Sequence, residues 1–507
     1  MLHSESRQGG TQGHRALIIF ACIFLALNIS ACKQSKEAEI DEAAQRLEQL
    51  YRNNSLDAQQ HLDILIADSH DTLYADRMER RYYNEGGQWR WMGAPDQIAL
   101  CDALDSVMHT QISAMGFRED IFNLADIDSA LAVMHQPDSA QNVALTMAQL
   151  EHNLTQAYLR YTIGQRFGFT TPSKLFGTHN FDIEIEQADS AFVDYAMKQL
   201  TDRQTMLDFL ASTEPTDSTY HMLKHQLTLD STNEAHDRTV CNMERLRWRD
   251  KKHAKDSARH IFVNVAAQQV WAIAPDSVIN MRICCGKAAT KTPLLSSEIQ
   301  KIEVNPEWGI PQSIIRGEVS GHAGDSAYFA RRNYYVVGSN GQRVNPGSLS
   351  RADLASGRYA VRQRSGAGNS LGRIIFRFPN KFSVYLHDTS SPSAFNRDVR
   401  TISHGCVRLQ RPFDIAEFVL PNADPWLLDK MRLSMDLQPK TEQGRQYKRT
   451  HGGAIRLVNN TEVNPKVPVL IDYYTCYRNP QTGQLETWGD PYGYDKIILK
   501  AIKPFLR

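Results

Sequence analysis

The spacing of hydrophobic residues changes once along this chain, and the change limits the folds that it can adopt. Between Gln141 and Arg166 the apolar residues recur at steps of three and four, which places on one helical face Val143, Met147, Leu150, Leu154, Tyr158 and Tyr161. After Arg238 apolar residues alternate or form short runs between Gly, Pro and Asn, as in β-strands. We therefore predict an α+β chain, with an N-terminal α-helical domain followed by a mainly β domain that carries a few helices.

The second part of the chain contains several short strand-like segments. We expect strands at His260–Val265, Gln269–Ile273, Met281–Cys285, Ile302–Val304, Tyr334–Val337, Gly372–Pro379, Lys381–Leu386 and Val467–Tyr474. Arg411–Leu420 has Pro412 at its start and apolar residues at helical spacing, so we expect a helix there.

Composition along the chain suggests the domain boundaries. We expect a helical domain over 41–227, a polar linker over 228–240 and the mainly β domain over 241–507. The stretch 311–359 is rich in Gly, Ser and charged residues, and a loop of that length is usually a functional lid, so we expect a mobile cap there. The aromatic pair Trp89 and Trp91 is compatible with sugar stacking or with helix packing, and we expect packing.

The N-terminus carries the only long apolar run, fourteen residues from Ala16 to Ile29 that follow Arg7 and Arg15. This is short for a membrane-spanning helix and typical of a signal peptide. The small residues before Cys32 resemble a bacterial lipobox, which predicts a lipoprotein signal peptide over 1–31, a lipidated Cys32 and a polar tether over 32–40. An ordinary cleaved signal or a short anchor is the alternative. Lys33 favours a periplasmic chain held at the outer membrane.

Charge and cysteine spacing exclude several classes of protein. Lys and Arg together number 57, as do Asp and Glu, so the chain lacks the basic footprint of a nucleic-acid-binding protein. The eight cysteines form no C-x-x-C pair, which argues against a zinc ribbon or a disulfide scaffold. After lipidation, one disulfide among the five cysteines other than Cys406 stays open as an alternative to free thiols.

Reactive side chains are densest between His387 and Arg408. A cysteine nucleophile needs a nearby base, and His387 at the end of an apolar strand supplies an imidazole for Cys406. We expect the helix after Cys406 to favour a partly ionised thiolate near neutral pH. Gly405 lets a substrate carbonyl approach backbone N–H donors, as an oxyanion hole requires. These are the parts of an acyl-transfer site.

Two other kinds of site fit the sequence less well. His387, His404 and Cys406 could ligate zinc, but no second Cys or acidic residue completes a known spacing. Gly366, Gly368 and Gly372 depart from the dinucleotide-binding pattern and lead into a strand. We therefore expect no metal and no cofactor.

The block from His387 to Arg408, His-x15-Ser-His-Gly-Cys-x-Arg, resembles the signature of the L,D-transpeptidase (YkuD) family. The flanking sequence resembles the large scaffold-bearing members that cross-link peptidoglycan, strongly over Asn242–Leu420 and weakly before Leu145. Further similar pieces are Phe378–Leu409, Asn242–Trp248, His260–Val265, Gly286-Lys287 with Thr292-Pro293, Val304–Pro311, Val361–Gly372, the tail segments Val467–Tyr474 and Asp490–Asp495 and, in the helical part, Leu154–Pro172. Many relatives carry a peptidoglycan-binding module where this chain has only Thr228–Val240, so wall recognition is expected to rest elsewhere.

The resemblance implies a mechanism for cell-wall biogenesis. Cys406 is the implied nucleophile, and His387 is its base and later its proton donor. The implied donor is a peptidoglycan tetrapeptide stem that loses D-alanine, and the acceptor is the diaminopimelate amine of a neighbouring stem, giving a 3→3 cross-link. Carbapenems would acylate the same cysteine.

The resemblance gives less definite roles to neighbouring residues. His404 is expected to shape the pocket or orient the loop, and Arg408 to hold the loop or a substrate carboxylate or to pair with a nearby acid. Ser403 is expected to cap the turn. The candidate substrate-binding residues are Asn305, Trp308 and Asp388. Trp308 is equally compatible with a core position, and the Asp388 side chain need not orient the base His387.

The same acyl-enzyme could meet other acceptors. Water would make the protein an L,D-carboxypeptidase, and a protein lysine would make it a lipoprotein-anchoring enzyme. A non-catalytic wall-binding lipoprotein is a further alternative, which the intact His387 and Cys406 pair argues against because binding alone needs no thiolate.

Overall fold

The computed structural model describes residues 45–46, 48–68, 73–136, 142–229, 233–252 and 254–507. The predicted signal peptide, tether and lipidation site at Cys32 lie outside these residues. The chain forms two compact units, each described here by itself. The helical unit contains the described residues up to Ser113 with Phe117–Thr162 and Asp189–Ser212, and the sheet unit contains Ala114–Gly116, Ile163–Ala188 and Thr213–Arg507.

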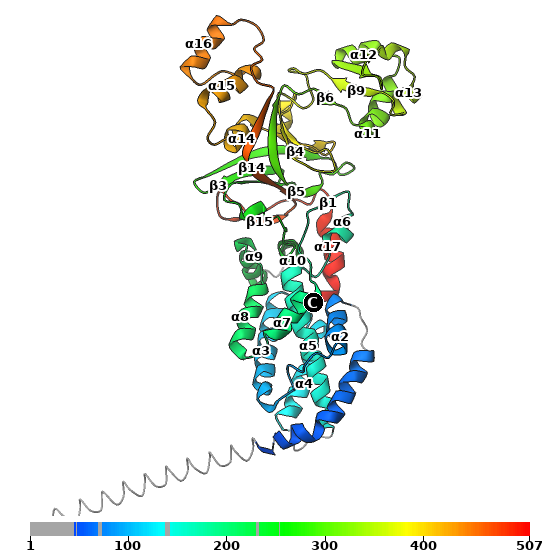
Figure 1. Cartoon of the computed structure of the whole chain (residues 1–507), viewed down its shortest axis with the longest axis vertical. Coiled ribbons are helices and arrows are strands. Elements are labelled where there is room, and N and C mark those ends of the chain that lie inside the picture. Colours follow the sequence, from blue (N-terminus) through cyan, green and yellow to red (C-terminus); the bar gives the residue numbers. More distant parts are fainter. Residues whose placement is uncertain (1–44, 47, 69–72, 137–141, 230–232, 253) are drawn as a thin grey trace, which may run out of the picture. The chain divides into compact units, whose positions relative to one another are not determined.

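The helical unit is built around one long helix (Figure 1). Its helices are 48–68, α2 (Tyr74–Asn84), α3 (Ile98–Ala114), α4 (Leu124–Met134), the part of α5 (Val143–Phe167) up to Thr162, α7 (Ser190–Lys198) and α8 (Arg203–Thr213) up to Ser212. The helical face predicted from the spacing in α5 is confirmed, because all six of its apolar residues are buried. Polar residues of α5 are buried too, which marks it as a central helix.

A buried carboxylate fixes the tryptophan loop of this unit. Glu151 on α5 is fully buried and accepts hydrogen bonds from the backbone N–H groups of Arg90, Trp91 and Met92 at 2.7–2.9 Å and from the Tyr83 hydroxyl at 2.6 Å. Trp91 is itself buried and donates to Thr155. The packing role expected for Trp91 is confirmed.

Eight strands of the sheet unit form a closed barrel. The ring order is β5 (Leu294–Val304), β10 (Ile374–Arg377), β11 (Leu386–His387), β13 (Val407–Leu409), β4 (Ser277–Gly286), β3 (Gln269–Ala274), β2 (His260–Asn264) and β14 (Asn460–Asp472). The ring closes because β14 pairs with both β2 and β5. Two short strands attach at its edges, β1 (Phe181–Asp182) to β5 and β12 (Thr401–Ser403) to β4. The predicted α+β class is confirmed.

Helices and a hairpin complete the sheet unit. They are α6 (Pro172–Phe176), α9 (Ser218–Leu229), α10 (Asn233–Arg247), α14 (Pro412–Val419), α15 (Pro425–Ser434), α16 (Glu442–Thr450), α17 (Tyr494–Ile502) and the hairpin β15 (Cys476–Arg478) with β16 (Leu485–Thr487). The helix expected after Arg411 is α14. Within the described residues no helix combines the length and apolar character that crossing a membrane requires.

The linker predicted over 228–240 is largely wrong. α9 continues to Leu229 and α10 begins at Asn233, so most of that segment is helical. The polar residues that suggested a linker serve the helix, because Glu234 pairs with Arg238 one turn later at 3.0 Å. Further along α10, the buried Arg245 pairs with Asp495 at 2.6 Å.

The expected cap is a folded subdomain, which corrects both its bounds and its description as a loop. We define the cap as residues 308–363. It has a four-stranded sheet in the order β6 (Trp308–Gly309), β9 (Ala360–Gln363), β7 (Tyr334–Val337) and β8 (Arg343–Val344). Short helices α11 (Gln312–Ile314), α12 (Ser326–Arg331) and α13 (Arg351–Ala355) and a π-helix (Ile315–Val319) accompany it.

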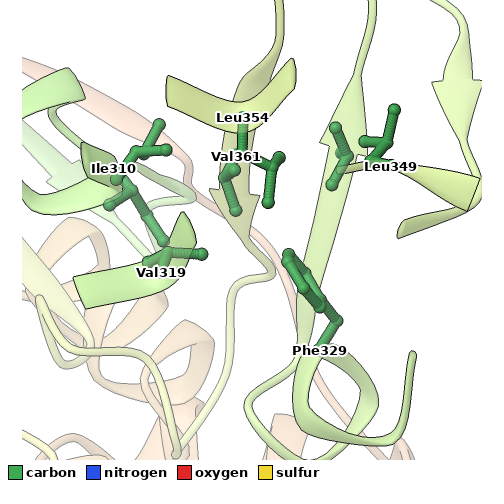
Figure 2. Packing of buried hydrophobic residues seen from close by; sticks show 8 residues of the cluster. Ile310, Val319, Phe329, Leu349, Leu354 and Val361 are labelled. Carbon is green, nitrogen blue, oxygen red and sulfur yellow. The ribbon is translucent and has the colours of Figure 1, made fainter. Parts of the chain in front are cut away.

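A small hydrophobic core explains why this segment folds. Ile310, Phe329, Leu354 and Val361 come from different parts of the cap and are all buried in one cluster (Figure 2). The strand residues Val336 and Val361 face each other across β7 and β9 within it. The cap thus has its own interior, and its predicted mobility stays a prediction.

Candidate active site

His387 lies on strand β11 of the barrel, and Cys406 directly precedes the neighbouring strand β13. β11 and β13 run parallel, with Leu386 opposite Val407 and His387 opposite Arg408. Because residues paired across neighbouring strands point to the same face, His387 and Arg408 share one face of the sheet. Cys406 lies two residues before Arg408, and the Arg408 guanidinium lowers the pKa of both His387 and Cys406, so both side chains lie near this one charge.

The environment of His387 keeps its imidazole neutral. The side chain is buried, and burial first and the nearby Arg408 guanidinium second lower its pKa to about 4, while backbone groups of Asp388 and Leu371 act in the opposite direction. Within the described part of the chain, Nδ1 has no hydrogen-bond partner. A neutral imidazole with an unpaired ring nitrogen has the properties of a general base.

Cys406 differs from the sequence expectation in two ways. It is followed by strand β13 and not by a helix, since α14 begins only at Pro412. Burial raises the pKa of its thiol, and a backbone hydrogen bond from Tyr385 and the charge of Arg408 offset this only in part. This direction is opposite to the partly ionised thiolate that we expected. The structure favours the thiol form of Cys406 and the neutral imidazole of His387.

The segment Ser403–Cys406, here called the catalytic loop, is shaped by two hydroxyl groups. The buried Ser403 hydroxyl donates to the Cys406 carbonyl at 2.6 Å and accepts from the Gly405 N–H at 3.1 Å. The Thr292 hydroxyl donates to the Gly405 carbonyl and accepts from the Gly286 N–H, both at 2.8 Å. Gly405 has a φ of +121°, a backbone conformation that favours glycine.

The hydrogen bonds of the catalytic loop determine which backbone N–H groups are available for the expected oxyanion hole. The Gly405 N–H is engaged by the Ser403 hydroxyl, so in this structure it is not a free donor. Ser403 has the turn-capping geometry that the sequence suggested.

His404 and Arg408 flank the pair in different ways. The His404 imidazole is partly exposed, and its Nε2 lies 2.7 Å from Oε1 of Glu318 on the π-helix of the cap. Arg408 lies opposite His387 on one side and Cys284 of β4 on the other. No hydrogen-bond partner is found for its Nε within the described residues.

The three candidate substrate-binding residues have other partners. Asn305 donates to the Ser434 carbonyl and accepts from Arg373 at 2.9 Å, so its amide fixes a turn with a φ of +50°. Asp388 accepts from the Arg373 N–H at 2.8 Å and therefore holds the turn before β10 and does not orient His387. Trp308 begins β6 and packs against the cap core, which is the core alternative noted for it.

Sequence reasoning assigned no role to Thr292 or Glu318. Tyr492 belongs to the same network as Thr292, because its hydroxyl donates to the Gly286 carbonyl at 2.7 Å and accepts from the Thr292 N–H at 3.0 Å. Tyr492 lies 86 residues after Cys406 in a loop before α17. Nothing in local sequence spacing signals such a contact.

Within the described residues, metal-ligating side chains do not gather around His387 and Cys406. Among the described residues, the group with metal-ligand atoms close together is Asp105, His109 and Asp128, which belongs to the helical unit. The six cysteines within the described residues are free thiols. Burial raises the thiol pKa of Cys285 to about 12 and of Cys476 to about 11, which makes both poor nucleophiles.

Comparison with known proteins gives two family matches. Residues 258–430 match the L,D-transpeptidase catalytic domain (YkuD), and residues 76–227 match the scaffold domain. The chain is also similar to a Haemophilus influenzae protein whose name assigns it to the L,D-transpeptidases, with 28% identity over 241 residues. That match covers 47% of this chain and 45% of the relative, so the chain spans about half the length of the relative.

Proposed function

Because the chain belongs to the scaffold-bearing L,D-transpeptidases, we propose that it is a cysteine-dependent L,D-transpeptidase that forms 3→3 cross-links in peptidoglycan. The observation that carries this proposal is that the buried, neutral His387 on β11 and Cys406 directly before the paired strand β13 both lie near the Arg408 guanidinium. A thiol beside a base with an unpaired Nδ1 is suited to acyl transfer.

The first half-reaction forms an acyl-enzyme. His387 Nδ1 takes the thiol proton as Cys406 Sγ attacks the carbonyl of the third residue of a tetrapeptide stem. The new S–C bond gives a tetrahedral intermediate, and its collapse breaks the amide bond to the terminal D-alanine. The imidazolium returns the proton to the leaving amine, so D-alanine departs and a thioester remains.

The second half-reaction transfers the acyl group. A diaminopimelate side-chain amine of a neighbouring stem attacks the thioester and gives its proton to His387. Collapse forms the new amide and breaks the S–C bond, and His387 returns the proton to Cys406. Because thiol and imidazole both begin neutral, the proton moves during the attack, which is how His387 acts as a general base.

The test is mass spectrometry of products from tetrapeptide-bearing muropeptides incubated with the full chain. We expect D-alanine release and a 3→3 linked dimer, both lost in Cys406→Ala and strongly reduced in His387→Ala. His404→Ala is the matched control, since His404 faces Glu318. Loss in His404→Ala with retention in His387→Ala would transfer the base role to His404. D-alanine release by Cys406→Ala would refute the covalent mechanism.

We also propose that carbapenems acylate Cys406, because their strained carbonyl resembles the donor acyl group. Intact-protein mass spectrometry should show one adduct that is absent in Cys406→Ala. An equal adduct on that variant would place the reactive thiol elsewhere. The other described cysteines are buried, so they should react slowly.

We further propose that the chain is exported to the periplasm and anchored by lipid on Cys32, with the outer membrane as its site. The support is the sequence alone, namely the apolar run from Ala16 to Ile29 that ends close to Cys32. A fatty-acid probe should label the wild type and not Cys32→Ala. Equal labelling of both proteins would contradict the proposal.

A further inference from the structure

The cap has a charge composition unlike that of the whole chain. Although acidic and basic residues balance over the full sequence, residues 308–363 contain seven arginines, no lysine and three acidic residues, and Arg364 follows directly. All three acids have partners. Glu318 contacts His404, Asp325 caps α12 and lies 3.9 Å from Arg331, and Asp353 caps α13 and lies 3.1 Å from Arg358.

Three of the other arginines, Arg343, Arg362 and Arg364, lie on one side of the cap sheet. Strand alternation directs Val336 and Val361 into the cap core, where Figure 2 shows Val361, and directs their strand neighbours to the opposite side. That opposite side, here called the outer face, carries Tyr335 directly across from Arg362, and Arg343 across from Val337. Both arginines are exposed.

The half-buried ring of Tyr335 contacts two of these guanidinium groups. The guanidinium carbon of Arg343 lies 4.6 Å from the centre of the Tyr335 ring, and that of Arg364 lies 5.9 Å from it. Stacking on an aromatic ring orders a guanidinium while leaving its N–H edge available. Gly309 beside Arg362 leaves the surface open, since a Cβ there would meet no atom within 4 Å.

The outer face is short of carboxylates. Within the described residues, Arg343, Arg362 and Arg364 form no ion pair. Glu307 is already engaged, because it accepts a hydrogen bond from the Tyr335 hydroxyl at 2.8 Å. Arginine recognises carboxylates through two parallel N–H···O bonds, so several ordered, unpaired guanidinium groups favour a ligand that carries more than one carboxylate.

We propose that the outer face of the cap binds the acidic stem peptides of peptidoglycan through their carboxylates. This rests on the proposed function, which makes stem peptides the substrate, and the support for the occupant is charge complementarity. The cap contacts the catalytic loop through Glu318 and His404, so a strand held on the cap is held on the unit that contains Cys406. The outer face would supply the wall recognition for which the sequence offers no separate module.

The test is co-sedimentation of the full chain with purified peptidoglycan sacculi. Arg343→Gln/Arg362→Gln should weaken binding about tenfold, as expected for two partly exposed charge pairs. The matched control is Arg331→Gln/Arg358→Gln, which removes the same charge from the same cap but from arginines that already face Asp325 and Asp353. It should bind within about twofold of the wild type. Sacculi with amidated stem carboxylates should bind all proteins equally weakly.

Each other outcome overturns the proposal. Unchanged binding by Arg343→Gln/Arg362→Gln excludes the outer face, and an equal loss in the control reduces the effect to net charge. Undiminished binding to amidated sacculi excludes carboxylates. Arginine-dependent binding to phosphatidylglycerol vesicles without binding to sacculi would assign the face to a lipid surface. Carbapenem adduct formation by the wild type tests the proposed function separately, because its failure leaves the sedimentation result unaffected.

Discussion

Replacing Arg408 by glutamine should move the pH dependence of Cys406 acylation upward. The pKa of His387 is about 4 against an ordinary value of 6.5, a depression of about 2.5 pH units that corresponds to about 3 kcal/mol. Burial is the larger cause and Arg408 the second, so removing the guanidinium should restore less than half of the depression, about 1 pH unit at most. Arg408 also lowers the pKa of the Cys406 thiol, so the alkaline limb should rise as well.

The assay is the rate of carbapenem adduct formation, followed by intact-protein mass spectrometry from about pH 3 to about pH 10, so that both limbs are covered. Arg411→Gln is the matched control, because Arg411 is nearby in sequence but pairs with Asp414 at 2.7 Å. In Arg408→Gln both limbs should move to higher pH, and in the control neither should. An unchanged or lowered acid limb in Arg408→Gln, or an equal shift in both variants, would refute the electrostatic account of His387.

The same pKa predicts how stability depends on pH. Since the folded-state pKa of His387 lies below the unfolded value, the unfolded chain takes up this proton first as pH falls. The contribution of His387 to stability is therefore complete above about pH 6.5 and is lost as pH falls towards and below about pH 4, by about 3 kcal/mol in total. Urea unfolding of the wild type and of His387→Gln should diverge over this range. If the unfolding free energies of the wild type and of His387→Gln changed in parallel with pH, the predicted contribution of His387 would be contradicted.

Three further substitutions test the supports of the fold and the loop. Gly405→Ala should cost about 1–3 kcal/mol through backbone strain at its φ of +121° and slow adduct formation at least tenfold, measured by thermal melting and mass spectrometry; normal kinetics would contradict it. Thr292→Val should destabilise by about 2–4 kcal/mol because two backbone groups lose their partner, whereas Thr292→Ser should stay within about 1 kcal/mol in urea unfolding. Glu151→Ala should cost about 3 kcal/mol or more by leaving the N–H groups of Arg90–Met92 unpaired, and an unchanged melting temperature would disprove this.

The parts of the fold that could be predicted from sequence are those with a regular hydrophobic period. The buried face of α5 and the strand Tyr334–Val337 follow directly from spacing. Helix α10 was not predicted from the sequence because its buried side chains include arginines. The buried charge of Arg245 is compensated by Asp495, which lies 250 residues away in sequence. A one-dimensional pattern contains no signal for such a pairing.

The cap and the electrostatics of the site escaped prediction for related reasons. The cap strands span two to four residues, and its core positions Ile315 and Val319 lie on a π-helix, which breaks the usual helical period. For Cys406 and His387 the sequence identified the residue types, but their pKa directions depend on burial and on Arg408, which strand pairing places opposite His387.

The two ends of the cap meet as paired strands, because Trp308 of β6 lies opposite Gln363 of β9. A segment that leaves and re-enters at adjacent positions behaves as an insertion, and a short turn could bridge the same gap. The hydrogen bonds that close the barrel do not pass through it. Insertion, deletion or exchange of the whole cap would therefore leave the barrel intact. To transfer the cap to another barrel of this kind, only the β6–β9 strand pair would have to be joined to the new chain.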